Sequence, residues 1–177
     1  MTPGAGVHGL QIFVNLPAEQ KLREPTVMRL SSEQMPRRVG EGWRAVQVFG
    51  GTAELALPWP AALAIVDVAP GASFEPALTD CEQGFALVIH GSGQAVGLPL
   101  SVGRALSLPA PGAVRLSAEE PLRLAVFTGR PLAEPLVRHG PFVMSDEGQV
   151  VAALKRFQTG GMGRLAARPL PRTTLNA

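Results

Sequence analysis

The sequence contains little cysteine and histidine and no long apolar run, and each shortage excludes a class of protein. Cys81 is the single cysteine, so the chain forms no intramolecular disulfide and no four-cysteine zinc site. No stretch of about 18 apolar residues occurs, so no membrane-spanning helix is expected. The first apolar run, residues 10–16, is interrupted by Gln11 and Asn15, which argues against a secretory signal. We therefore expect a cytoplasmic protein in a reducing compartment.

Charge is spread unevenly over the 177 residues, although the net charge is only +2. After residue 154 there is no acid but there are five basic residues, which leave a net −3 on residues 1–154; they are Lys155, Arg156, Arg164, Arg168 and Arg172. A basic end of this kind can meet nucleic acid or an acidic surface, but only one aromatic residue, Phe157, accompanies it. We expect a flexible N-terminus over residues 1–6 and a basic C-terminal tail over 160–177. This tail would contact nucleic acid weakly at most, and no membrane partner is expected.

Glycine and proline are abundant, at 20 and 17 residues, and they separate short apolar segments at intervals of about 8 to 12 residues. This rhythm indicates an all-β sandwich or barrel rather than alternating strands and helices. The predicted strands are residues 10–16, 25–30, 43–49, 61–68, 84–90, 93–97, 104–108, 113–116 and 122–128.

One segment, residues 145–159, predicts an α-helix. Ser145 can cap its start, the acids that follow suit the positive end of the helix dipole, and Gly160 with Gly161 ends it. Its apolar stripe consists of Val150, Val151, Leu154 and Phe157. We expect this helix to pack on the outside of the sandwich with the stripe facing inward.

Two longer stretches carry a resemblance to a known family. The first is residues 8–17, His-Gly-Leu-Gln-Ile-Phe-Val-Asn-Leu-Pro, and the second is residues 129–144, which contain Arg-His-Gly-Pro-Phe. Together with Gly161-Met162-Gly163 they resemble the pirin family, a two-barrel group within the cupin superfamily. The resemblance implies an all-β fold: a single jelly-roll β-sandwich of the cupin type with one C-terminal α-helix packed outside. Residues 7–159 would form this domain, with residues 7–17 as a linking strand.

The resemblance also implies a chemistry. Pirins have two jelly-roll domains, and a mononuclear iron in the first is held by three histidines and a glutamate. Some members cleave quercetin with dioxygen, and others act as transcriptional cofactors. Because those ligands lie upstream of the first stretch, we expect this chain to correspond to the C-terminal half of such a protein. The motif residues here are expected to be structural; they are His8, Gly9, Gln11, Asn15, His139, Gly140, Pro141 and Phe142.

The cupin signature itself persists in this half, but its metal ligands do not. The spacing from Gly71 to Gly91 matches the first motif, and it assigns the ligand positions to Ala77, Thr79 and Gly84. The second motif assigns its histidine to Val114 or Arg115. Only Thr79 offers an oxygen donor, whereas a non-heme iron site needs three or four nitrogen or oxygen donors. We therefore predict no bound metal, no other cofactor and no catalytic residue.

The remaining reactive side chains support the same interpretation. A replacement metal site would need two of the three histidines, His90 among them, to converge with carboxylates such as Glu75, Asp80 or Glu82. Asp80 and Glu82 flank Cys81 and disfavour its thiolate, so a nucleophilic cysteine is not expected.

Serine chemistry and phosphate binding are not expected either. Ser31, Ser92 and Ser101 lack the glycine-bounded elbow of a nucleophile, and residues 91–93 read as a hairpin turn. Arg115 must meet a carboxylate, an anion or solvent, and we expect it on the rim, facing outward.

Three functions remain open from the sequence. The favoured one is a metal-free pirin-like binding or regulatory protein, with a homodimer or a partner chain covering the face where a first cupin would pack. The second is a quercetinase-like dioxygenase that holds iron or another divalent transition metal with His90, His139 and nearby carboxylates. The third is a small-molecule-binding barrel that accepts an apolar or anionic ligand near Arg115.

Overall fold

The structure is a computed structural model that describes residues 9–76, 78, 82–108 and 114–163. The chain divides into two compact units, which are treated separately below. The larger unit is Glu19–Ala133, and the smaller one combines Met1–Ala18 with Glu134–Ala177. The expectation of one cupin-type domain over residues 7–159 stays a prediction.

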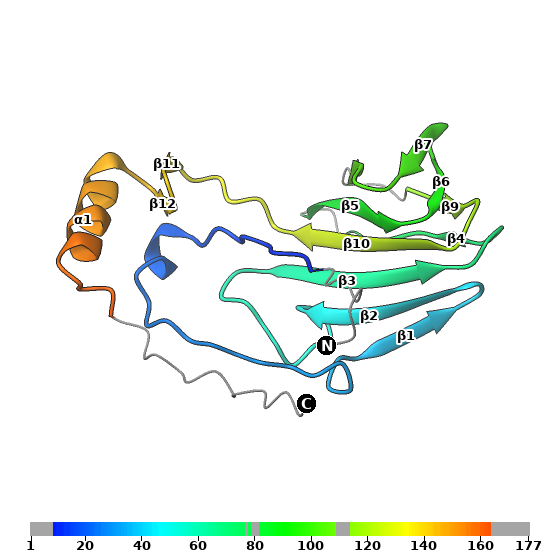
Figure 1. The fold of residues 1–177 in the computed structure, drawn as a ribbon, viewed down its shortest axis with the longest axis horizontal. Helices are drawn as coiled ribbons and strands as arrows, with labels where there is room; N and C mark the ends of the chain where they lie inside the picture. The colour runs from blue at the N-terminus through cyan, green and yellow to red at the C-terminus, as the bar shows by residue number, and fades with distance from the viewer. Residues whose placement is uncertain (1–8, 77, 79–81, 109–113, 164–177) are drawn as a thin grey trace, which may run out of the picture. The chain divides into compact units, whose positions relative to one another are not determined.

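The larger unit consists of two antiparallel sheets (Figure 1). The six-stranded sheet has the order β1-β2-β3-β10-β5-β8, with β1 Arg37–Gly40, β2 Trp43–Phe49, β3 Ala61–Val68, β10 Leu122–Gly129, β5 Gln83–His90 and β8 Ala105–Leu108. The four-stranded sheet has the order β4-β9-β6-β7, with β4 Ser73–Phe74, β9 Leu116–Ala118, β6 Ser92–Ala95 and β7 Leu98–Ser101. A short 3-10 helix, η1 (Ala18–Gln20), lies at the boundary between the two units. The predicted all-β jelly-roll sandwich is confirmed.

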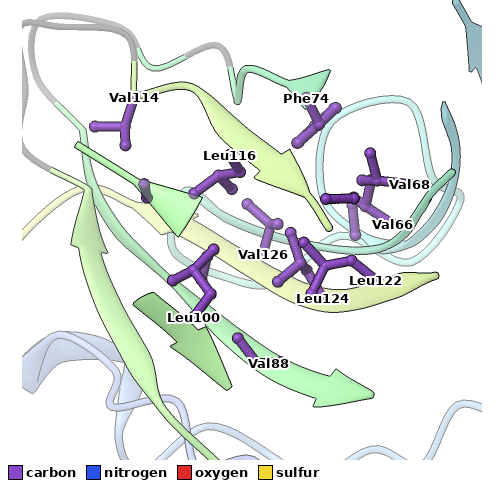
Figure 2. Packing of buried hydrophobic residues seen from close by; sticks show 14 of the residues in the cluster. Val66, Val68, Phe74, Val88, Leu100, Val114, Leu116, Leu122, Leu124 and Val126 are labelled. Carbon is purple, nitrogen blue, oxygen red and sulfur yellow. The ribbon is translucent and has the colours of Figure 1, made fainter. Parts of the chain in front are cut away.

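The core of this unit lies between the two sheets. Leu122 and Leu124 of β10 point toward Leu100 and Leu116 of the four-stranded sheet, as Figure 2 shows, and Leu116 and Leu124 are completely buried. Because side chains alternate between the faces of a strand, every second residue of β3, β5 and β10 contributes to this core.

Inward-facing side chains become smaller toward one end of the six-stranded sheet. This taper is present on three neighbouring strands: Val68, Val66, Ala64 and Ala62 on β3, Val88, Ala86 and Gly84 on β5, and Leu122, Leu124, Val126 and Thr128 on β10. Since Thr128 pairs with both Ala62 and Gly84, the small residues of the three strands lie side by side. The core is therefore filled at one end of the sandwich and thinly filled at the other.

Several predicted elements differ from the structure. Residues 10–16 and 25–30 form no strand, although both segments contain β-formers, because a strand needs a partner to accept its backbone hydrogen bonds. The polar segment β1 is a strand because it pairs with β2 at the edge of the sheet. Its composition, Arg-Arg-Val-Gly, gives no apolar alternation to predict it.

The turn predicted at residues 91–93 is a corner between sheets and not a hairpin. β5 belongs to the six-stranded sheet and β6 to the four-stranded one, so the chain changes sheets at Gly91. Gly91 has φ +79, and a Cβ there would overlap the carbonyl oxygen of Pro121. Only glycine fits this corner.

The smaller unit contains the helix and a short hairpin. Strands β11 Val137–His139 and β12 Phe142–Met144 pair around Gly140, and helix α1, Glu147–Gln158, packs on both strands. The contact includes a T-shaped ring pair between Phe142 and Phe157 with centroids 6.1 Å apart.

The helix is correctly predicted, but its cap and its buried face are not. Asp146 is the N-cap, and its carboxylate accepts a hydrogen bond from the backbone N–H of Gln149, in place of the predicted Ser145. Val150 and Ala153 are buried, whereas Val151 is 65% exposed. The difference arises because the helix packs against a narrow hairpin, which covers less of its surface than a sheet would. No helix in the described part of the chain is long and apolar enough to cross a membrane.

The filled end of the core predicts the effect of a cavity-forming substitution. Leu124→Ala should lower the free energy of unfolding by about 2 to 5 kcal/mol, because it removes buried contacts that neighbours cannot replace. Urea unfolding followed by circular dichroism measures this change. Leu98→Ala, on a residue that is 55% exposed, is the matched control and should change stability by less than about 0.5 kcal/mol. Equal effects of the two substitutions would contradict the placement of the core.

Candidate functional site

A cavity of about 530 Å³ lies at the thinly filled end of the larger unit. It is lined by side chains of β2, β3 and β10 and by the segments that follow β2 and β4. Ala62, Ala64 and Thr128, the small residues at the end of the taper, form part of its wall. The cavity is therefore a consequence of side-chain size along the strands.

Gln47 is the buried polar residue of this wall, with 8% of its surface exposed. Its Nε2 donates hydrogen bonds to the carbonyl oxygens of Phe49 at 2.9 Å and of Leu63 at 3.0 Å. The pairing of β2 with β3 shifts register between Gln47 and Phe49, and such a bulge interrupts the regular ladder of backbone hydrogen bonds. Gln47 thus satisfies two carbonyl groups at the irregular part of the sheet, and its amide orientation is fixed by them.

Both tryptophans of the chain also line the cavity. The Trp59 Nε1 donates a 2.7 Å hydrogen bond to the carbonyl oxygen of Arg130, whose guanidinium lies 6.0 Å from the centre of the Trp59 rings. Trp43 makes a T-shaped contact with Phe74 at 5.0 Å. The two indoles are therefore held by separate contacts, and the cavity has aromatic walls of fixed position.

The positions that the cupin spacing assigns to metal ligands do not fit a metal. A Cβ at Gly84 would overlap the carbonyl oxygen of Phe127, so the backbone of β10 leaves no room for a side chain there. Val114 is buried in the apolar core, and Arg115 is exposed and pairs with Glu75 at 2.8 Å. Ala77 and Thr79 lie outside the described residues. None of the three described positions supplies a nitrogen or oxygen ligand for iron.

The histidines and acids considered for a replacement site are dispersed. His90 is exposed at the end of β5 in the larger unit, and His139 is exposed at the end of β11 in the smaller one. Glu82 is half-buried and lines the cavity, while His8, Asp80 and Cys81 lie outside the described residues. Within the parts of the chain that are described, no three His, Cys, Asp or Glu side chains are grouped to hold a metal.

The motif residues of the sequence analysis fall into two segments. Gly9, Gln11 and Asn15 lie in a stretch without helix or strand. The second group, residues 139–142, forms the β11–β12 turn, where Gly140 has φ +55. The structural role expected for these residues stays a prediction.

The serines that were not expected to be nucleophiles lie in a turn and in paired strands. Ser31 opens a turn in which its backbone N–H donates to Gln34 Oε1 at 2.9 Å. Ser92 and Ser101 pair with each other across β6 and β7.

A charged cluster crosses three strands at the filled end of the same sheet. Asp67 of β3 accepts hydrogen bonds from Arg123 of β10, one of them at 3.2 Å, and from Arg44 of β2 at 3.0 Å. The hydrogen bond from Arg123 is the largest cause of the lowered pKa of Asp67, and Arg44 adds to it against the opposing effect of burial. The cluster links the three neighbouring strands β2, β3 and β10.

Family comparison agrees with this architecture. The Pirin C-terminal cupin domain family matches residues 63–163, which is more than half of the chain. The chain belongs to the pirin family. The pirin-like protein of Caulobacter vibrioides is 27% identical over 161 residues, which cover 87% of this chain and 58% of that protein. The pirin-like protein of Solanum lycopersicum is 26% identical over 180 residues, covering 92% of this chain and 60% of the relative.

A solved structure shows the same pirin-type fold. The quercetin 2,3-dioxygenase of Acinetobacter baumannii superposes with a TM-score of 0.80 at 22% identity, covering 86% of this chain and 56% of that one. This pirin therefore spans less than two thirds of each of these relatives. At this level of identity the likeness shows the fold.

Sequence reasoning placed a ligand near Arg115, which is not among the described residues that line this cavity, and so missed its location, although a signal for it was present. Gln47 interrupts an otherwise apolar inward row on β2, and the inward rows of β3 and β5 end in alanine and glycine. A polar residue in a predicted core row, next to rows that become smaller, indicates a cavity wall. The pattern cannot be recognised strand by strand, because the register between the strands decides which of these residues lie side by side.

The charged cluster makes stability depend on pH in a defined direction. The pKa of Asp67 is lowered below its usual value of 3.8 by folding, so its stabilising effect is complete above that value and is lost as pH falls through the lower folded pKa. Asp67→Asn should lower the free energy of unfolding by about 1 to 2 kcal/mol at pH 7.

The difference between the two proteins should begin to narrow below about pH 4, where Asp67 of the unfolded chain becomes protonated, and should disappear below the lower pKa of Asp67 in the folded protein. Urea unfolding at pH 7, 5 and 3 measures it, with Glu120→Gln on an exposed turn as the control. A difference that stays constant from pH 7 to pH 3 would contradict the ion-pair assignment.

Proposed function

We propose that this cupin domain is a metal-free pirin-like binding module rather than a catalyst. The observation that carries the proposal is that none of the described cupin ligand positions holds a side chain suited to binding a metal. Gly84 has no room for a side chain, Val114 is part of the apolar core, and the exposed guanidinium of Arg115 forms an ion pair with Glu75. A redox-active iron needs three or four nitrogen or oxygen ligands, and these residues supply none.

A binding function is supported by the cavity of the larger unit. The cavity combines aromatic and apolar walls with one buried carboxamide, Gln47, which is the composition typical of small-molecule sites. Its walls are held in place without a ligand, since Trp43, Gln47 and Trp59 each have a partner within the protein. Such preorganisation lowers the entropy that binding has to overcome.

The alternative is a quercetinase-like dioxygenase, the activity in the name of the Acinetobacter baumannii structure. That enzyme would need a metal site built from residues outside the cupin signature. His90 and His139 belong to different compact units, and the described acids form no group with them. The alternative therefore lacks a supporting site in the described residues, and no reaction step is assigned to this domain.

Metal analysis distinguishes these two functions directly. The 177-residue chain, purified without a histidine tag and then incubated with iron, manganese, nickel or copper salts and desalted, should retain well under one ion per chain. The reason is the missing ligand set at Gly84, Val114 and Arg115. Elemental analysis gives the stoichiometry, and the melting temperature should be unchanged by EDTA. One tightly held ion per chain, with a lower melting temperature after EDTA, would overturn the proposal.

Association with a second chain is the other part of the proposed function. We expect the chain to form a homodimer, or to bind a partner protein, because large apolar side chains of the larger unit, Val27 and Val39 among them, are exposed. Size-exclusion chromatography with light scattering at micromolar concentration measures the mass, and a value near twice 18.6 kDa is expected for the homodimer. A measured mass that stays near 18.6 kDa as the concentration rises would contradict the homodimer.

A further inference from the structure

The cavity carries enough chemistry to name the class of molecule that it fits. We propose that it binds a neutral, flat aromatic molecule that donates one hydrogen bond from a ring N–H to Gln47. This inference rests on the proposed metal-free binding function, because it assigns the ligand to a cavity without a metal. Its four supports are the free oxygen of Gln47, the aromatic walls, the balance of charge and the size of the cavity.

Gln47 lines the cavity, and its amide nitrogen is already engaged by backbone carbonyls. Its Nε2 is directed at the carbonyl oxygens of Phe49 and Leu63, and turning the amide around would set oxygen against oxygen. Oε1 is therefore the atom left for a ligand, and no residue in the described ranges donates a hydrogen bond to it. Gln47 is more than nine-tenths buried, so a donor that reaches this oxygen meets little competition from bulk water.

The walls favour a flat ring. Trp43, Trp59 and Phe74 all line the cavity, and Trp43 and Phe74 contact each other edge to face. Aromatic ligands gain from stacked or edge-to-face contact with such rings beyond the gain from burial. Trp59 is fixed by its hydrogen bond to the carbonyl oxygen of Arg130, so little side-chain freedom is lost on binding.

The charges around the cavity favour a neutral ligand. Among the lining residues that the structure describes, Arg38 and Glu82 have opposite signs, and the third charged one, Glu75, forms an ion pair with Arg115. A charged ligand would enter a partly apolar space without a matching charge, which is costly. The volume of about 530 Å³ is within the range of roughly 300–1,000 Å³ that small-molecule sites occupy.

A ring N–H fits Gln47 better than a hydroxyl does. An indole-type N–H is a donor only, so one acceptor satisfies it completely. A hydroxyl also brings oxygen lone pairs that need donors of their own. Gln47 offers none, because both of its amide hydrogens are directed at backbone carbonyls.

Indole and 1-methylindole test this directly, because a methyl group replaces the N–H donor in the second molecule while the ring system stays the same. The probes are titrated into the ¹⁵N-labelled 177-residue chain with EDTA present. The readout is the pair of indole N–H signals of Trp43 and Trp59, which are the only two tryptophans and both line the cavity. Indole should shift both signals saturably, and 1-methylindole should bind roughly 2- to 10-fold more weakly, the range expected for one neutral hydrogen bond.

Two matched variants locate the site. Ala62→Leu fills the cavity and should abolish the saturable shifts, whereas Ala105→Leu makes the same change at an exposed position of β8 and should retain them. Thermal unfolding confirms that each variant is folded. If Ala62→Leu does not fold, the comparison of the two probes on the unaltered chain still decides the hydrogen bond.

Three outcomes would overturn the inference: equal affinity for the two probes, no saturable shift with indole, or shifts retained by a folded Ala62→Leu variant. EDTA removes any contribution of a bound metal to these titrations. A failure here therefore leaves the metal analysis unaffected, and an ion found there overturns the proposed function independently.

Discussion

Contact between the inward rows of the two sheets stabilises the larger unit and also determines where the cavity lies. Leu116, Leu122 and Leu124 are almost fully buried where these rows are large, and they provide the apolar burial on which the sandwich depends. Farther along the same strands, the small side chains of Ala62 and Ala64 form part of the cavity wall. One gradient of side-chain size thus separates the densely packed part of the sandwich from the part that contains the cavity.

Polar contacts keep the open half from collapsing. Gln47 satisfies two backbone carbonyls beside the bulge of β2, and Trp59 is anchored to the carbonyl of Arg130. A buried carbonyl without a donor is costly, so the amide of Gln47 stabilises the irregular part of the sheet whether or not a ligand is present. The same bonds leave Oε1 as the atom of this amide that the proposed ligand would reach. Gln47 would then have a structural and a binding role at once.

Much of the fold follows from local pattern, and the differences have physical reasons. The strands 43–49 and 61–68 agree with β2 and β3 residue for residue, because apolar alternation and turn residues mark both ends. Residues 10–16 have the same kind of pattern but no strand to pair with, and pairing is a property of the whole chain. The predicted helix cap was Ser145 and the observed one is Asp146. Composition cannot resolve this difference of one residue, because both side chains are good caps.

The candidate site was only half predictable for a similar reason. The spacing alone assigns Gly84, Val114 and Arg115 to the cupin ligand positions. The cavity depends on register across β2, β3, β5 and β10, which brings together residues more than 60 positions apart. A single sequence contains no direct record of that register.

Gly84 has a consequence for the engineering of this barrel. Because a Cβ there would collide with the carbonyl of Phe127, introducing a carboxylate at this position also requires β5 and β10 to move apart. A single substitution at Gly84 therefore cannot add a ligand to the barrel without displacing a strand. A designer who wanted a metal in this scaffold would have to rebuild the backbone before choosing the residues.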